Sequence, residues 1–321
     1  MPRIVRRDCD SCYHVVSRVN GREFLLRDVE KEAFVDLLWR VAGFCGVKVL
    51  AFAILDNHFH LLVEVPAKVG ELSDEALLDR AQLLYGKERR RQPLSLVRIA
   101  RALQAGGAAR EGMRSLLLGR MASLPMFVKI LKQRFSISFN LKYGRSGTLW
   151  EDRFHSVLVE NAAIALRTVA AYIDLNPVRA GIVDDPKDYR FSGYGAAAGS
   201  KGGVAGYGLF RYLKERFGDG STTLASLAGA YRKLLYIKGS QGPRESVFTA
   251  EEVRKVLATG GNLSTAQLLR CRLHFLTAGA VIGSRAFVEN FISARKRKRG
   301  RVKECPNEFL GEGDLHALRA R

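Results

Sequence analysis

The sequence lacks any long apolar run. No stretch approaches the ~20 apolar residues that a membrane span needs, and the start of the chain, Met1 to Asp8, has no apolar core of a secretion signal. Cysteine is also scarce, since the five cysteines are odd in number and scattered, which argues against a disulfide framework. Cys9 and Cys12 form a C-x-x-C pair, but no second pair lies nearby to complete a zinc site. We therefore expect a cytoplasmic protein with reduced thiols.

Acidic residues are few relative to basic ones. The chain has 32 Asp and Glu against 52 Lys and Arg, which gives a formal net charge of +20. Such an excess indicates a polyanionic partner, nucleic acid first, and would place the protein at the nucleoid. A role in solubility alone is the alternative, and the uneven distribution of the charge disfavours it. Hydrophobic residues make up 47% of the 321, enough for a packed core.

Residues 1–200 show a regular alternation of predicted elements. Apolar periodicity and turn signals predict strands at 12–19, 47–55, 58–65 and 154–159, and helices at 28–44, 122–143 and 162–175. This order is that of a ferredoxin-like α+β fold, an antiparallel sheet with helices on one face. Residues 67–120 interrupt the order and are predicted to be a helical insertion.

The region 201–321 is predicted to be a second unit, helical and basic. Three helix starts are visible, two of them capping boxes at Thr249 and Ser264 and one at Ser284. The last two helices, joined by residues 278–283, could form a helix-turn-helix-like DNA-binding unit.

The densest charge of the chain follows, with seven basic residues among the nine of 295–303. A solvated tail is the simplest interpretation. In contact with DNA, the segment would increase the binding affinity through phosphate contacts that are sensitive to salt and independent of the DNA sequence. The candidate DNA-binding residues here are Arg295, Lys296, Arg297, Lys298 and Arg299.

Two pairs of side chains are spaced so that both members of each pair face the same way, as the residues of a binding or catalytic site would. His58 and His60 lie two apart on a predicted strand, so both imidazoles point to one face and could bind a metal ion; a structural histidine pair is the alternative. Tyr172 and Asn176 lie four apart on a predicted helix and share a face. Asn176 precedes Pro177, where the helix must end, so its side chain is expected to reach sideways. From spacing alone, Tyr172 is better explained as a half-buried aromatic residue.

Four segments in order resemble the single-tyrosine HUH transposases, and among them the REP-associated tyrosine transposases most. The segments are Tyr13-His14-Val15 with Ser17-Arg18, then Asn57-His58-Phe59-His60-Leu61-Leu62-Val63, then residues 144–154 (GRSGTLWEDRF), then residues 172–181 (YIDLNPVRAG). The resemblance covers roughly residues 10–66 and 121–195. It implies an HUH nuclease domain within residues 1–200.

The resemblance also implies a reaction. His58, His60 and Asn176 would bind one Mg²⁺ or Mn²⁺, and Tyr172 would attack a DNA phosphate, release a 3′-OH and hold the 5′ end as a phosphotyrosine. The substrate would be single-stranded DNA with hairpins, cut and rejoined as in transposition and recombination. Candidate phosphate contacts are Arg145 and Arg153, and His155 is interpreted as a strand or DNA-contact residue.

Two other functions fit the same residues. A regulator derived from a transposase would bind DNA hairpins without cutting them. The presence of His58, His60, Tyr172 and Asn176 together favours the enzyme over this regulator. A plasmid-replication or conjugation nuclease would share the chemistry, and the segments at 144–154 and 172–181 disfavour it. Relatives include monomers and homodimers, so both states stay open.

Overall fold

The computed structural model describes residues 4, 6, 8–86, 94–236, 277, 279–299, 307–309 and 315–319. Its centre is a sheet in the strand order β2-β3-β1-β4-β5-β7-β6. The first four strands are β1 (Ser11–Arg18), β2 (Lys48–Ile54), β3 (His58–Val65) and β4 (His155–Val159), and they pair with one another in antiparallel fashion. The predicted α+β class and the ferredoxin-like order of these four strands are confirmed. The short 3-10 helices are Asn20–Arg22, Pro186–Asp188 and Val204–Gly206.

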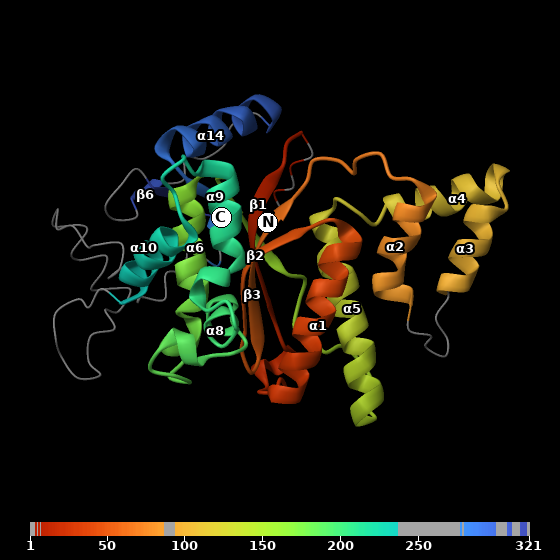
Figure 1. Ribbon diagram of the computed structural model, residues 1–321, viewed down its shortest axis with the longest axis horizontal. Helices are drawn as coiled ribbons and strands as arrows, with labels where there is room; N and C mark the ends of the chain where they lie inside the picture. Colours follow the sequence, from red (N-terminus) through yellow and green to blue (C-terminus); the bar gives the residue numbers. More distant parts are fainter. Residues whose placement is uncertain are drawn as a thin grey trace.

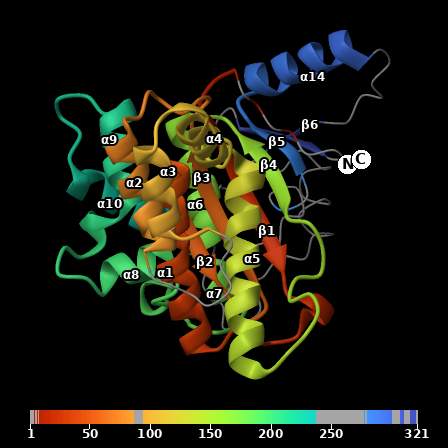
Figure 2. The same cartoon turned by 90° about the vertical axis from the view of Figure 1, so that its right-hand side faces the viewer.

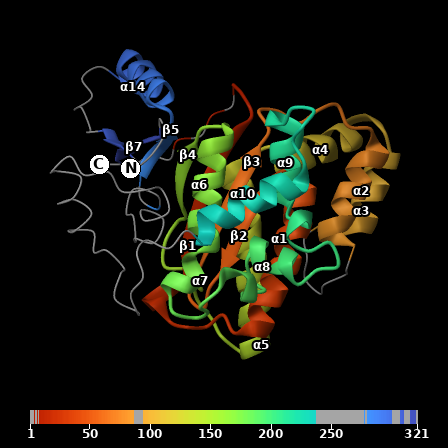
Figure 3. The same ribbon diagram turned by 60° about the vertical axis from the view of Figure 1, so that its left-hand side comes forward.

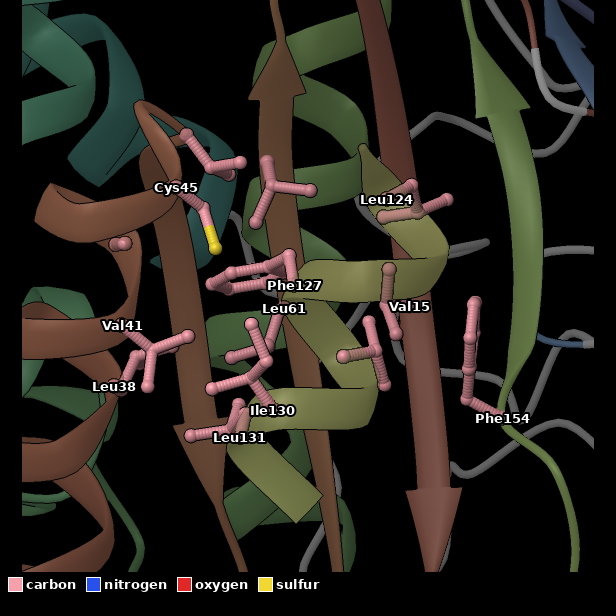
Figure 4. Packing of buried hydrophobic residues seen from close by; sticks show 14 of the residues in the cluster. Val15, Leu38, Val41, Cys45, Leu61, Leu124, Phe127, Ile130, Leu131 and Phe154 are labelled. Atoms are coloured by element: carbon pink, nitrogen blue, oxygen red, sulfur yellow. The ribbon is translucent and has the colours of Figure 1, made fainter. Parts of the chain in front are cut away.

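Helices α1 (Asp28–Cys45) and α5 (Leu124–Tyr143) cover one face of this sheet (Figures 1 and 2). Figure 4 shows Val41 of α1 and Phe127 and Leu131 of α5 packed over Val15 and Leu61 of the sheet. The Ser123 hydroxyl accepts a hydrogen bond from the Met126 amide and caps α5, and a left-handed glycine ends each helix. The apolar side chains of the predicted helix at 122–143 are therefore part of the core.

The opposite face of the sheet is covered as well. It carries α6 (Ala163–Asp174), α7 (Asn176–Arg179), α8 (Gly193–Ala198), α9 (Gly208–Phe217) and α10 (Leu224–Tyr236) (Figure 3). Of the three helices predicted on one face, α1 and α5 lie there, whereas the third, α6, lies on the opposite face. The reason is that Cys12, Leu62 and Val157 make this face apolar too, so water must be excluded from both sides.

The predicted helical insertion is confirmed. It consists of α2 (Asp74–Tyr85), α3 (Leu96–Gln104) and α4 (Gly107–Leu118), with α2 beside α1 (Figure 1). Leu77 and Ala81 of α2 extend the α1–α5 core, and the Asp74 carboxylate accepts hydrogen bonds from Arg110 and Arg114. The insertion therefore enlarges the hydrophobic core on the face away from α6. Among the described residues, no helix is long and apolar enough to cross a membrane.

The last part of the chain returns to the sheet. It forms β5 (Gly279–Gly283), parallel to β4, then α14 (Arg285–Arg299), β6 (Asn307–Phe309) and β7 (His316–Arg319). The prediction that residues 278–283 are the turn of a helix-turn-helix unit is wrong. Val281 and Ile282 are fully buried, and their backbone pairs with β4 and β7, so partners distant in sequence make this segment a strand.

The other predictions for this region have mixed outcomes. The cap at Ser284 is confirmed, because its hydroxyl accepts a hydrogen bond from the Phe287 amide at the start of α14. The predicted helix starts at Thr249 and Ser264 lie outside the described residues. The division of the chain near residue 200 stays a prediction.

A buried carboxylate ties the later helices to α6. Asp174 is fully buried and accepts hydrogen bonds from the hydroxyls of Tyr207 and Tyr231 at 3.0 and 2.6 Å and from the Tyr194 amide at 3.3 Å. Burial raises the pKa of Asp174 to about 7, against the opposing effect of these hydrogen bonds. The end of α6 is thus held in place by residues from three separate segments.

Replacing Asp174 by alanine is expected to destabilise the protein. The Asp174→Ala variant leaves three buried donors without their acceptor, which should lower the free energy of unfolding by roughly 2–4 kcal/mol. Urea unfolding monitored by circular dichroism measures the change. Asp184→Ala, at an exposed position, is the control and should unfold like the wild type. Equal stability of all three proteins would contradict a structural role for the buried carboxylate.

Candidate active site

The histidine pair lies at the start of β3. The tight turn at Asp56 and Asn57, closed by a 2.8 Å hydrogen bond from the Leu55 amide to the His58 carbonyl, begins the strand. His58 and His60 project to the same face, as the alternation along a strand predicts, with ring centroids 5.1 Å apart. That face lies under α6. His58 is half-buried, whereas His60 is only 3% exposed.

Tyr172 approaches the pair from the helix above. Strand β4 runs away from the His58 end of the sheet, and α6 runs back, so residues near the end of α6 return to the level of the histidines. The ring of Tyr172 is 6.2 Å from that of His60, centroid to centroid. Tyr172 is only 4% exposed. The structure therefore brings the predicted nucleophile and the predicted ligands together, in a nearly closed site.

Asn176 does not reach sideways as expected. The short helix α7 begins at this residue, and its side-chain amide turns back to donate hydrogen bonds to the carbonyls of Tyr172 and Ile173, at 3.1 and 3.3 Å. That part of the prediction is wrong, because Pro177 starts a new helical turn and does not release the chain. With Nδ2 engaged in this way, Oδ1 is the atom of Asn176 suited to binding a cation.

Two further residues belong to this cluster and were not assigned a role from the sequence. Arg179 stacks on Tyr172, with its guanidinium carbon 4.0 Å from the ring centroid, and it also donates to the Tyr172 carbonyl. Its signal in the sequence is the spacing of seven from Tyr172, about two helical turns. His14 on β1 is fully buried, and its Nε2 lies 3.0 Å from Nδ1 of His60. No sequence pattern shows that contact, since it depends on strand register.

The protonation state of His60 suits metal binding. Burial lowers the pKa of His60 well below its ordinary value, and the neighbouring His58 and His14 lower it further. His60 is therefore a neutral imidazole near neutral pH, which is the form that binds metals. The carbonyl oxygen of the Asn57 side chain accepts from Nδ1 of His58 at 2.7 Å, so in the neutral form of His58 the lone pair is on Nε2.

Few side chains at this site could bind a metal ion. Within the part of the chain that the structure describes, no group of three or more His, Cys, Asp or Glu side chains could hold a metal ion. The candidate set is instead two imidazoles and one amide oxygen, from His58, His60 and Asn176. Such a set suits Mn²⁺ better than Mg²⁺, because imidazole is a softer ligand than the oxygens that Mg²⁺ prefers. The residues present fit a divalent ion that also takes ligands from a bound substrate.

The predicted DNA contacts lie at several places. Arg145 and Arg153 are exposed in the loop before β4, and this loop attaches to the end of β1, where the Glu151 amide donates to the Arg18 carbonyl at 3.0 Å. Arg18 lies opposite His58, so the loop is beside the site. Arg145 is 3.9 Å from the Glu23 carboxylate. His155 is exposed on β4.

The basic run begins in the last turns of α14. Residues 295–299 are helical, and their side chains, together with residues 300–303, lie outside the described part of the structure. Helix α14 follows β5 in the chain and lies far from the helices of the insertion, α2 to α4 (Figures 1 and 3). The run is therefore attached to the sheet by β5.

Residues 9–73 match the protein family described as "Transposase IS200 like". The predicted resemblance to these transposases is confirmed over this segment, which contains His58 and His60; Tyr172 and Asn176 lie outside it. No curated protein matches the chain. One solved structure, described as "REP associates tyrosine transposase bound to a REP hairpin", aligns with 14% identity and a TM-score of 0.39 over 62% of this chain and 86% of that chain.

Proposed function

We propose that this chain, whose residues 9–73 match the IS200-like transposase family, is a metal-dependent endonuclease and strand transferase for single-stranded, hairpin-containing DNA. The observation that carries the proposal is the convergence of Tyr172 with His58 and His60. These residues come from a helix and a strand far apart in the chain, yet their rings meet in one cluster. A phenol beside two imidazoles is a combination of nucleophile and metal ligands.

The metal ion would be held by Nε2 of His58, Nε2 of His60 and Oδ1 of Asn176. When bound, it supplies a Lewis acid that withdraws charge from a phosphate oxygen. All three ligands are neutral, so the negative charge at the site would come from the DNA phosphate. Metal affinity is therefore expected to rise further when DNA is bound.

The chain's own residues would carry the transfer. The Tyr172 oxygen forms a bond to phosphorus and loses its proton, while the bond from phosphorus to the 3′ oxygen breaks and that oxygen gains a proton. One phosphate ester replaces another, so the step is reversible and a second 3′-OH can accept the strand. Arg179 stacks on the Tyr172 ring at 4.0 Å and places a positive charge where the phosphate charge must approach.

Burial sets a condition on this reaction. Tyr172, His60 and Asn176 are 4%, 3% and 8% exposed, so a DNA strand can reach them only after the site opens. The proposal therefore includes an opening step on DNA binding. The same burial supports the second candidate, a hairpin-binding regulator that does not cut.

One assay separates the two functions. Labelled single strands bearing a hairpin are incubated with the protein and Mn²⁺, and the products are separated on denaturing gels. A covalent protein–DNA adduct supports the enzyme. Hairpin binding with neither adduct nor cleavage, over a range of hairpin sequences, supports the regulator and contradicts the enzyme.

The basic run should make DNA binding more sensitive to salt. Truncation after Ala294 is a poor test because it also removes β7, which pairs with β5. Replacing the five basic residues 295–299 by glutamine is expected to lower the slope of log K against log salt by about 0.7 for each lost phosphate contact on a single strand. Fluorescence anisotropy at several salt concentrations measures the slope.

The control replaces two basic residues elsewhere. Lys187 and Arg190 form ion pairs with Asp185 and Asp28, and their glutamine variants should leave the slope unchanged. An unchanged slope in the 295–299 variant would show that the run does not contact DNA.

A further inference from the structure

We propose that His14 is a positioning residue that sets the tautomer of His60, and that it thereby makes His60 competent to bind the metal ion. The inference rests on the proposed function, because it concerns a ligand of the proposed metal site. It adds a residue from a different strand, β1, which neither spacing nor the family match assigns to the site.

The contact is built into the sheet. On the face below α6, His60 lies opposite Val16 of β1, and His14 lies opposite Leu62 of β3, so the two histidines are diagonal neighbours. Nε2 of His14 is 3.0 Å from Nδ1 of His60, and the rings stack with centroids 5.2 Å apart. Both residues are buried, with His14 at 0% and His60 at 3% exposure. Water therefore does not readily replace His14 as the partner of Nδ1.

A neutral imidazole has one N–H donor and one acceptor nitrogen, which gives this contact two arrangements. If His60 donates from Nδ1 to Nε2 of His14, the lone pair of His60 is on Nε2 and can bind a metal. If His14 donates instead, the proton of His60 sits on Nε2 and blocks binding. Only the first arrangement is compatible with the proposed site, so His14 must act as the hydrogen-bond acceptor.

The neighbouring ligand supports this choice. His58 donates from Nδ1 to the Asn57 side-chain oxygen at 2.7 Å, which leaves its lone pair on Nε2. With His14 accepting from His60, both ligands would present the same nitrogen toward the metal. Partners of this kind hold the ring orientation of ligating histidines in metal sites, and their loss costs about 10- to 100-fold in metal affinity.

Two substitutions at His14 separate the acceptor from the ring. Glutamine places an acceptor oxygen near the position of Nε2, whereas phenylalanine keeps a ring and offers no acceptor. We expect His14→Phe to weaken Mn²⁺ binding by about 10- to 100-fold and His14→Gln to remain close to the wild type. Electron paramagnetic resonance titration of Mn²⁺ measures the affinity without any DNA reaction. His316→Phe, on β7 and separated from β3 by three strands, is the matched control and should bind Mn²⁺ like the wild type.

A second measurement needs no metal. Nitrogen NMR of ¹⁵N-labelled histidine reports which ring nitrogen of His60 carries the proton, with His60→Gln used to assign the signals. We expect Nδ1–H in the wild type and in His14→Gln, and loss of that preference in His14→Phe. Circular dichroism confirms that each variant is folded.

The outcomes are distinct. Wild-type Mn²⁺ affinity in His14→Phe would overturn the inference while leaving the proposed function intact. Equal weakening by phenylalanine and glutamine would also overturn it, because packing and not the acceptor would then matter. An Nε2–H tautomer of His60 in the wild type, with no Mn²⁺ bound, would overturn the inference, whereas the proposed metal site fails only if the wild type binds no Mn²⁺.

Discussion

Replacing Tyr172 by phenylalanine is expected to abolish the covalent protein–DNA adduct and to reduce cleavage by ~10³-fold or more, because the variant has no nucleophilic oxygen. Phenylalanine keeps the ring that packs near His60 and beneath Arg179, so the fold and the hairpin affinity should be retained. The measurement is the yield of adduct on denaturing gels with labelled hairpin strands and Mn²⁺.

The other tyrosines provide the control. Tyr143 lies on α5, on the face of the sheet away from α6, and Tyr143→Phe should form the adduct at the wild-type rate. Tyr189 and Tyr194 are buried, and the Tyr189 hydroxyl donates to the Ile54 carbonyl at 2.6 Å. Equal adduct formation by Tyr172→Phe and the wild type would show that another residue is the nucleophile.

Replacing His58 by alanine is expected to reduce cleavage by ~10³-fold while leaving hairpin affinity largely unchanged. His58 is the better test of the two ligands, because it is half-buried, whereas removal of the buried His60 would leave a cavity and His14 without its partner. Affinity should persist because contacts to the DNA backbone elsewhere supply most of it. Cleavage assays and fluorescence anisotropy measure the two effects separately.

His316 offers a matched histidine on β7, which β1, β4 and β5 separate from β3 in the sheet. His316→Ala should cleave like the wild type. If His58→Ala lost hairpin binding and cleavage to the same extent, the histidine pair would be structural and the metal assignment would fail.

Local patterns accounted for most of the secondary structure. The predicted strand at 58–65 and the predicted helix at 28–44 agree with β3 (His58–Val65) and α1 (Asp28–Cys45) to within one residue. Their signals are short-range, since alternation, helical periodicity and turn residues all act within a few positions of the chain. The same patterns did not predict the strand at 279–283. A short apolar run does not reveal its secondary structure until the strands that pair with it are known.

The sequence by itself determined that His58 and His60 share one face, because side-chain direction follows from the period of a strand. It predicted Tyr172 and Asn176 on one helix, whereas the structure places Tyr172 on α6 and Asn176 at the start of α7. Only the tertiary structure decided that α6 packs on the face carrying the histidines, that His14 contacts His60, and that Arg179 covers Tyr172. It also decided that the site is nearly closed. Strand register and helix packing depend on contacts between segments far apart in the chain, and local periodicity carries no information about them.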